Sequence, residues 1–290
     1  MFVDGGRRLH FDDGSPVTAA SAIAPLGDGW LVAQDDATIA AWRRPGSVVP
    51  VRVLPPVEGL DRFSEAAGTK RSKPDLEVAC PAVVDGEPAV LLLGSGSSPR
   101  RMRGVLVRLV DGEPVATAAD LTPLYGRTAG ELGLPLDQLN LEGAARHEDR
   151  VRWFQRGNLA AGIASASVDL SLEAVVAAVL GRADAAEVPA GRPLRYDLGE
   201  VEGVGLAVTD AVALPDGRML LSAAAEDTPN AVDDETVVAV EPLPEVDGHV
   251  HKVEGLAIGA VDGGTVHLLA VVDDDDPAAP SAELDLRAEL

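Results

Sequence analysis

Acidic side chains recur at one position of a repeated pattern along this chain. Glu77, Glu142, Asp210 and Glu254 each stand near the start of an apolar run that leads into a tight turn and a second apolar run. A related first copy carries Ser21 at this position. If the repeats surround an axis, the carboxylates converge in a central channel, where their mutual repulsion calls for a neutralising cation. Because the ligands are oxygens, we expect Ca²⁺, with Mg²⁺ as the alternative, held by Glu77, Glu142, Asp210 and Glu254.

Basic residues are grouped near the same segments, although the chain as a whole is strongly acidic. In one interpretation they hold a small anionic substrate, while Glu142 and Glu77 act as the catalytic groups beside the cation. The alternative is that they only neutralise neighbouring carboxylates. The predicted substrate-binding residues are Lys70, Arg71, Lys73, Arg156, Asn158 and Lys252.

The spacing of the repeats predicts the architecture. Each of five copies has an apolar run, a turn rich in Gly and Asp, a second apolar run and a polar or acidic cluster. Successive anchors from Ser21 to Glu254 lie 56, 65, 68 and 44 residues apart. Each unit has room for two outer strands, so we predict an all-β fold, a five-bladed β-propeller of four-stranded blades forming one domain over residues 1–290. The alternatives are six blades, with a degenerate blade between Ala160 and Leu206, and two packed β domains.

Outer strands can be placed within these units. Segments Gly104–Val110 and Glu113–Ala118 follow the second hairpin, and Thr236–Glu241 and Gly248–Val253 follow the fourth. The two ends of the chain are expected to complete the last blade, because such pairing removes exposed sheet edges. In this arrangement Arg7–Phe11 lies beside Glu283–Leu286.

Two helical insertions are also predicted. Apolar residues from Leu172 to Leu180 follow helical spacing, with Ser171 as the N-cap and Gly181 at the end. The pair Thr122-Pro123 indicates a second, short helix in which Thr122 caps the start.

The composition excludes several classes of function. Among 290 residues, 47 are acidic and 24 basic, which gives a formal net charge of −23. Nucleic acids and anionic membranes are bound by basic surfaces, so neither is an expected partner. Aromatic residues make up only 3% of the chain, which argues against a platform for stacking bases. The single cysteine, Cys80, cannot form an internal disulfide and is expected in the core. Because the chain has one cysteine and no long apolar run, we expect a cytoplasmic protein.

Other catalytic and metal motifs are absent. His147 lacks a second histidine at the spacing of a zinc-binding helix. Gly94–Ser97 does not match a nucleophile elbow or a phosphate loop and is interpreted as a strand end. The acidic run Asp273–Asp276 lacks the glycine and glutamate of a calcium-binding helix–loop–helix and is interpreted as a solvated turn. His249 and His251 are interpreted as a solvated or packed pair.

Three segments carry a resemblance to a known group of proteins. Lys73–Glu77, Asn140–Ala144 and Val253–Ala257 contain a D-x-E or an E-G signature. They resemble the inner-strand signatures of bacterial phytase-like and SdiA-regulated-like β-propellers, most closely the uncharacterised members of that group. Asp210 and Ser21 depart from the glutamate found there. The resemblance implies a propeller in which channel-facing glutamates are associated with calcium, here Glu77, Glu142 and Glu254.

Two functions from different classes follow from these features. The first is a hydrolase acting on a small anionic ester or lactone, in which the cation polarises the scissile oxygen and activates water. The second is a non-catalytic binding or scaffold propeller whose cation is structural.

Overall fold

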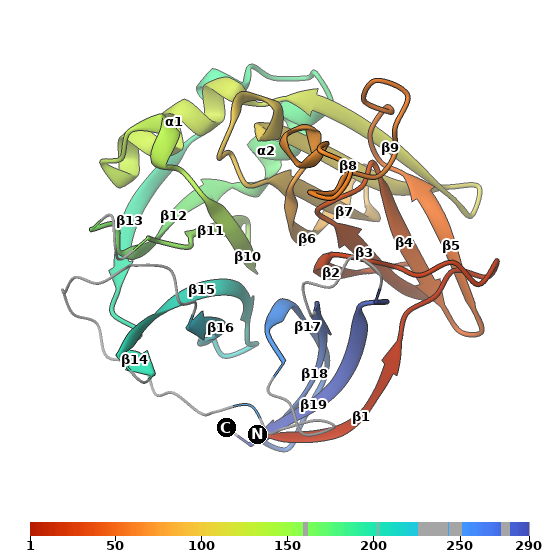
Figure 1. Ribbon diagram of the computed structural model, residues 1–290. Helices are drawn as coiled ribbons and strands as arrows, with labels where there is room; N and C mark the ends of the chain where they lie inside the picture. The colour runs from red at the N-terminus through yellow and green to blue at the C-terminus, as the bar shows by residue number, and fades with distance from the viewer. Residues whose placement is uncertain (159–161, 202, 226–242, 244–250, 274–278, 290) are drawn as a thin grey trace.

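Five antiparallel sheets surround a central axis in the computed structural model, which describes residues 1–158, 162–201, 203–225, 243, 251–273 and 279–289 (Figure 1). Each blade packs its inner strand against the inner strand of the next, and the last packs against the first. The protein is therefore a five-bladed β-propeller, as predicted. The inner strands are β2 (Ala20–Leu26), β6 (Leu76–Val84), β10 (Leu141–His147), β15 (Val204–Ala213) and β17 (Val253–Asp262).

The first three blades each have four strands paired in sequential order. This order follows from the tight turns seen in the sequence: Asp85 and Gly86 both have positive φ, which suits a two-residue hairpin turn. The outer strands predicted after the second hairpin are confirmed. Beyond the inner strands, these blades contain β3 (Gly29–Gln34), β4 (Ile39–Arg44), β5 (Ser47–Arg52), β7 (Glu87–Gly94), β8 (Arg103–Val110), β9 (Glu113–Asp120), β11 (Arg150–Gln155), β12 (Ser165–Ser171) and β13 (Ala190–Tyr196).

The fourth blade has three strands among the described residues, β14 (Glu200–Val201), β15 and β16 (Met219–Ala225). The predicted strand Thr236–Glu241 lies outside the described residues, as does the first half of Gly248–Val253. In the second half His251 and Lys252 are in no strand, and Val253 is the first residue of the inner strand β17. A sixth blade between Ala160 and Leu206 is not formed. The described part of that segment instead supplies β12 and β13 to the third blade, and β14 with the start of β15 to the fourth.

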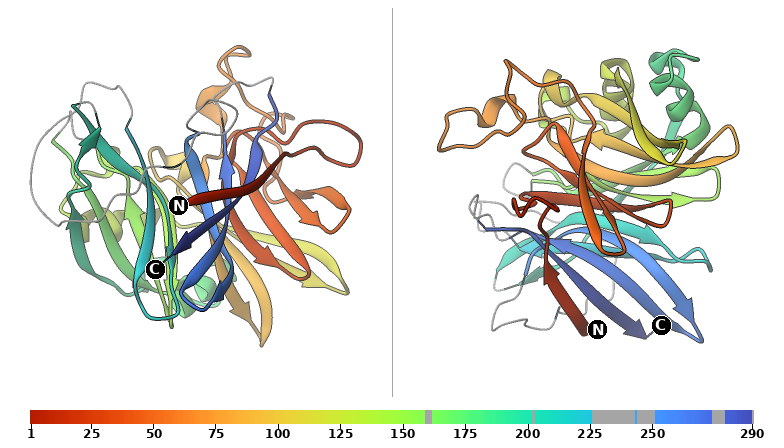
Figure 2. Two further views of the ribbon diagram at one scale, coloured as in Figure 1. Left: turned by 90° about the horizontal axis from the view of Figure 1, so that it is seen from below. Right: turned by 90° about the vertical axis from the view of Figure 1, so that its right-hand side faces the viewer.

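The two ends of the chain pair and close the ring, but only Arg7 and Arg8 of the predicted segment Arg7–Phe11 belong to the N-terminal strand. The N-terminal β1 (Phe2–Arg8) pairs with β19 (Ala282–Glu289), which pairs with β18 (Thr265–Val272). Figure 2 shows β1, in red, beside the dark blue β19. Glu283 of β19 is buried and accepts hydrogen bonds from Arg7 Nε at 3.0 Å and from Arg43 Nη2 at 2.7 Å. The closure is therefore both a strand pairing and a salt-bridged contact with β4 of the first blade.

The structure has two helices in the described residues: α1 (Thr122–Leu132) connects the second blade to the third, and α2 (Leu172–Val179) lies between β12 and β13 of the third blade. The predicted Ser171 cap is confirmed, since its hydroxyl accepts the Ala174 N–H at 3.3 Å. The cap predicted at Thr122 is wrong. Thr122 is already helical, and its N–H is satisfied by the Asp120 carboxylate at 2.9 Å. Within the described ranges, no helix is both long and apolar enough to cross a membrane. Short 3₁₀ turns are η1 (Lys70–Ser72), η2 (Pro99–Arg101), η3 (Leu136–Gln138) and η5 (Ala185–Glu187).

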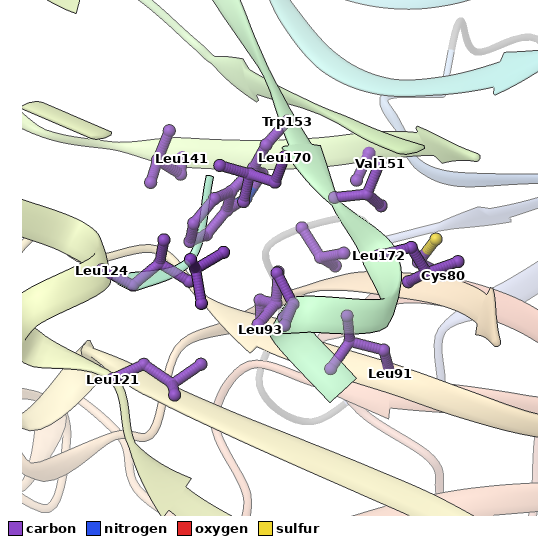
Figure 3. Packing of buried hydrophobic residues seen from close by; sticks show 14 of the residues in the cluster. Cys80, Leu91, Leu93, Leu121, Leu124, Leu141, Val151, Trp153, Leu170 and Leu172 are labelled. Atoms are coloured by element: carbon purple, nitrogen blue, oxygen red, sulfur yellow. The ribbon is translucent and has the colours of Figure 1, made fainter. Parts of the chain in front are cut away.

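The largest core cluster lies between the second and third blades and beneath both helices (Figure 3). Trp153 is fully buried there and meets the Tyr125 ring edge-on, with ring centroids 4.9 Å apart. Cys80 belongs to this cluster, which confirms its predicted core position. Because burial raises the pKa of the Cys80 thiol to about 12, no thiolate is available at neutral pH. This packing holds the second blade, which carries Glu77, against the third, which carries Glu142.

Candidate functional site

Every inner strand contains a β-bulge, which lies near the start of β2, β6, β10 and β17 and in the middle of β15. The strand register shifts at this point in β2, β6, β10, β15 and β17. A bulge leaves one residue outside the regular pairing and re-aims its side chain. The bulged residues are Ser21, Glu77, Glu142 followed by Gly143, Thr209 and Glu254.

In the fourth repeat the bulged residue is therefore not Asp210, which the sequence analysis predicted, but the residue before it. Thr209 occupies the bulge of β15, whereas Asp210 has already returned to the ladder opposite Ser222. The repeated position therefore carries three glutamates and two hydroxyls. Asp210 is not among the residues that line the cavity at the axis.

Asp210 makes contacts of a different kind. Its carboxylate accepts the backbone N–H groups of Ala211 at 2.7 Å, Leu256 at 2.7 Å and Ala144 at 3.2 Å. These donors belong to three neighbouring inner strands, so Asp210 ties β10, β15 and β17 together. Burial raises the pKa of Asp210 to about 7, while the three N–H groups act to lower it. Gly143 makes room for this contact, since a Cβ there would lie 2.5 Å from Asp210 Cα.

The bulged glutamates open into a polar cavity of about 490 Å³ at one mouth of the channel. Two kinds of position supply most of the lining: residues at the start of an inner strand, and residues that directly follow the second strand of a blade, such as Asp35, Arg156 and Asp273. Apart from two alanines, every lining side chain is polar or charged. The lining consists of Ala19, Ala20, Ser21, Asp35, Lys73, Asp75, Glu77, Arg101, Asn140, Glu142, Arg156, Lys252, Glu254 and Asp273.

Asp35, Asp75 and Glu77 form a three-carboxylate cluster, in which one oxygen from each lies within 4.8 Å of the others. The Lys73 ammonium contacts two of them, at 2.5 Å from Asp35 Oδ2 and 2.7 Å from Asp75 Oδ1. Arg101 Nη1 lies 2.8 Å from Asp75 Oδ2. Although burial acts to raise it, Lys73 and Arg101 keep the pKa of Asp75 below its ordinary value.

Glu77 differs from the other acids of the cavity. No hydrogen bond or salt bridge involves its carboxylate within the described residues, whereas Asp35 and Asp75 are both paired. Burial raises the pKa of Glu77 well above its ordinary value, and the negative charges of Asp75 and Asp35 raise it further. The cavity thus holds one acidic group whose ionised form lacks a direct partner.

Glu142 and Glu254 are both paired with a basic residue. Glu142 Oε1 accepts from Arg156 Nη1 at 3.0 Å and from Asn140 Nδ2 at 2.8 Å. Glu254 Oε1 lies 2.9 Å from Lys252 Nζ. Burial raises the pKa of Glu254 to about 7 although Lys252 lowers it, and burial also leaves the pKa of Glu142 raised against the effect of Arg156. These two glutamates can therefore change protonation more easily than ordinary surface carboxylates.

Some residues predicted from the sequence lie elsewhere. Lys70 is exposed and pairs with Glu65, at 2.9 Å, and Arg71 is exposed too. Asn158 is exposed at an isolated bridge with Ile163 and does not line the cavity. The predicted residues that do come together are Lys73, Glu77, Glu142, Arg156, Lys252 and Glu254.

Sequence reasoning missed several members of the cavity, namely Asp35, Asp75, Arg101, Asn140 and Asp273. Asp273 was interpreted as part of a solvated turn, but it lines the cavity and accepts from Ser281 Oγ at 2.8 Å. The rest of that run, 274–276, lies outside the described residues, as does His249. A signal for Asp35 and Asp273 existed, because both belong to the polar cluster that ends a repeat.

The fold and this cavity define a five-bladed β-propeller with a charged pocket on its axis. The chain belongs to DUF6910, a family of unknown function, whose family model matches residues 69–277. No curated protein matches the chain.

Several solved structures are similar in outline. A luciferin-regenerating enzyme is 12% identical, with a TM-score of 0.39, over 95% of this chain and 80% of that one. The extracellular domain of a two-component system protein from B. thetaiotaomicron is 7% identical, with a TM-score of 0.38, over 92% of this chain and 28% of that one. A protein provisionally described as a gluconolactonase is 12% identical, with a TM-score of 0.34, over 90% of this chain and 72% of that one.

Proposed function

We propose that the axial cavity binds a divalent cation, Ca²⁺ in the first instance and Mg²⁺ as the alternative, and hydrolyses a small anionic ester or lactone. The observation that carries the proposal is the unpartnered Glu77 carboxylate beside Asp35 and Asp75. Two oxygens bound to one Ca²⁺ at about 2.4 Å can lie no more than about 4.8 Å apart. The three-carboxylate cluster meets this limit and offers only oxygen ligands, which hard cations prefer.

Asp35, Asp75 and Glu77 would hold the cation. Asp210 is left out of this ligand set because its oxygens already accept three backbone N–H groups. The resemblance of the Asp75-Leu76-Glu77 segment to phytase-like propellers also supports calcium. When bound, the cation would polarise a carbonyl or phosphoryl oxygen and lower the pKa of a bound water.

The remaining charged groups of the cavity suit the binding and protonation of an anionic substrate. Arg156 and Lys252 would exchange their contacts with Glu142 and Glu254 for contacts with the anion. Glu254, with a pKa of about 7, is suited to accept or release a proton at neutral pH. Glu142, held by Arg156 and Asn140, would serve beside it as the second acid–base group.

Calorimetric titration with Ca²⁺ tests the cation site. We expect wild-type protein to bind one Ca²⁺ and Glu77→Gln to bind it at least tenfold more weakly, since one charged ligand is removed. Glu65→Gln is the matched control, because Glu65 is an exposed carboxylate outside the cavity and should not change the titration. Equal Ca²⁺ affinity in wild type and Glu77→Gln would contradict the assignment.

A second candidate is a non-catalytic binding or scaffold propeller in which the cation is structural. It is favoured by one observation: all four basic residues of the lining, Lys73, Arg101, Arg156 and Lys252, are already paired with carboxylates. Thermal melts with and without EDTA, run beside a panel of phosphate esters and lactones, separate the two. Strong stabilisation by Ca²⁺ with no turnover supports the scaffold. Turnover that Glu254→Gln abolishes without loss of the folded state supports the hydrolase.

A further inference from the structure

Lys73 occupies the place between two acids of the proposed cation site. Its ammonium contacts Asp35 and Asp75 at 2.5 and 2.7 Å, so both carboxylates share one positive charge. The side chain is 17% exposed, which leaves it a route into the cavity that it lines. A lysine ammonium carries one charge on a flexible four-carbon stem and can be moved more readily than a bidentate arginine.

Resting on the proposed function, we propose that Lys73 is a built-in counter-ion which a divalent cation must displace. The ammonium and the cation compete for the carboxylates of Asp35 and Asp75, whereas Glu77 makes no hydrogen bond or salt bridge with Lys73 among the described residues and is open to the cation. Binding of the cation therefore includes the cost of releasing Lys73. The released ammonium moves into the cavity, where it becomes a further group for the anionic substrate.

Two features of the site support displacement over simultaneous binding. Asp75 is held on its other side by Arg101 Nη1 at 2.8 Å, and it also accepts from Ser95 Oγ, so it stays in place when Lys73 leaves. Asp75 has a positive φ of 57°, and its backbone N–H donates to the Asp35 carbonyl at 2.9 Å, which fixes these two acids relative to each other. The carboxylates are thus preorganised, and Lys73 is the member of the cluster that can move.

The proposal predicts tighter cation binding when the ammonium is removed. If the unpaired form of Lys73 is populated at about 1–10%, the apparent Ca²⁺ affinity is reduced about 10- to 100-fold by this competition. We therefore expect Lys73→Met to bind Ca²⁺ at least tenfold more tightly than wild type in calorimetry. Lys70→Met is the control, because Lys70 pairs with Glu65 outside the cavity and should leave the affinity unchanged.

A second measurement follows Lys73 in the unaltered protein. The amine is acetylated with a water-soluble succinimidyl ester, and modification at Lys73 and Lys70 is compared by mass spectrometry. We expect Ca²⁺ to increase the labelling of Lys73 severalfold and to leave Lys70 unchanged, because only Lys73 is released. A thermal melt of Lys73→Met under the same conditions checks that the variant is folded.

The outcomes separate this inference from the proposed function. If neither wild type nor Lys73→Met binds Ca²⁺ or Mg²⁺, the cation site itself is overturned. If wild type binds Ca²⁺, and Lys73→Met binds it equally or more weakly while Lys73 labelling is unaffected by Ca²⁺, the site stands and the counter-ion role is overturned. Tighter binding by Lys73→Met, with Ca²⁺-dependent labelling in wild type, supports both.

Discussion

Ser21 and Thr209 make the same hydrogen bond at two places in the ring. The Ser21 hydroxyl donates to the Leu76 carbonyl at 2.5 Å, and the Thr209 hydroxyl donates to the Val253 carbonyl at 2.6 Å. Leu76 and Val253 are the first residues of the next inner strands, β6 and β17. In two blades the bulged side chain therefore joins neighbouring blades, whereas in the other three it is a glutamate that faces the cavity.

This equivalence can be tested by removing one hydroxyl. We expect Thr209→Val to lower the free energy of unfolding by about 1–2 kcal/mol, because the replacement is nearly isosteric and leaves a buried carbonyl without its donor. Urea denaturation measures the change. Thr117→Val in the outer strand β9 is the control and should stay within about 0.5 kcal/mol of wild type. An unchanged midpoint for Thr209→Val would mean that the bridge contributes nothing.

Close approach of the inner strands predicts that Gly143 cannot be replaced. It has a φ of +68°, and a Cβ would meet Asp210 Cα at 2.5 Å, so we expect Gly143→Ala to destabilise the fold by more than about 2 kcal/mol. Gly126 in α1 has open space around it, and Gly126→Ala should instead stabilise by about 0.5–1 kcal/mol. Thermal melts of both variants check the contrast. Similar effects at the two glycines would refute the packing argument.

Ring closure depends on Glu283, whose side chain is 1% exposed. We expect Glu283→Gln to cost about 3–5 kcal/mol, because it leaves the Arg43 guanidinium, only 13% exposed, without its anion. Arg7→Gln should cost much less, since Arg7 is 53% exposed and water can replace its contact. Asp4→Asn, which breaks the more exposed pair with Arg287, serves as the control with little effect. Guanidinium unfolding ranks the three variants, and a cost for Arg7→Gln equal to that of Glu283→Gln would contradict the explanation.

The raised pKa of Glu254 predicts a pH dependence of stability. Its pKa is about 7 in the folded protein and 4.5 ordinarily, so the folded state binds more protons between these values. The contribution of Glu254 to the free energy of unfolding therefore falls as the pH rises from about 4.5 to about 7. Over this pH range we expect the free energy of unfolding to fall less in Glu254→Gln than in wild type. The difference between the two should be no more than about 3 kcal/mol.

Urea unfolding in EDTA at several pH values from about 4.5 to 8 measures this dependence. Glu65→Gln is the control and should keep the wild-type slope, since Glu65 is fully exposed. Parallel pH profiles for wild type and Glu254→Gln would show that the side chain does not titrate as inferred.

Much of the fold could be predicted from local pattern. Hairpin turns such as Asp85-Gly86 and the helical spacing after Ser171 depend on neighbouring residues, so their signals lie within short windows of sequence. The repeat spacing also predicted five blades, because each of the first four sheets is built from one continuous stretch of chain. The fifth joins the two chain ends, which the need to pair the remaining sheet edges predicted. The same regularity indicates that Glu77, Glu142 and Glu254 converge, and all three line the axial cavity.

Contacts between distant segments decided the rest. A bulge shifts the register by one residue, and this shift separates Thr209 at the repeated position from Asp210 in the ladder, although both are polar and adjacent. The contact of Lys73 with Asp35 exists only when the first and second blades are packed together, because Asp35 follows β3 of the first blade and Lys73 precedes β6 of the second. Residue types along the chain therefore indicate which groups are available for chemistry. Electrostatic pairing depends on distance and burial, and only the assembled ring sets these for groups that come from different blades.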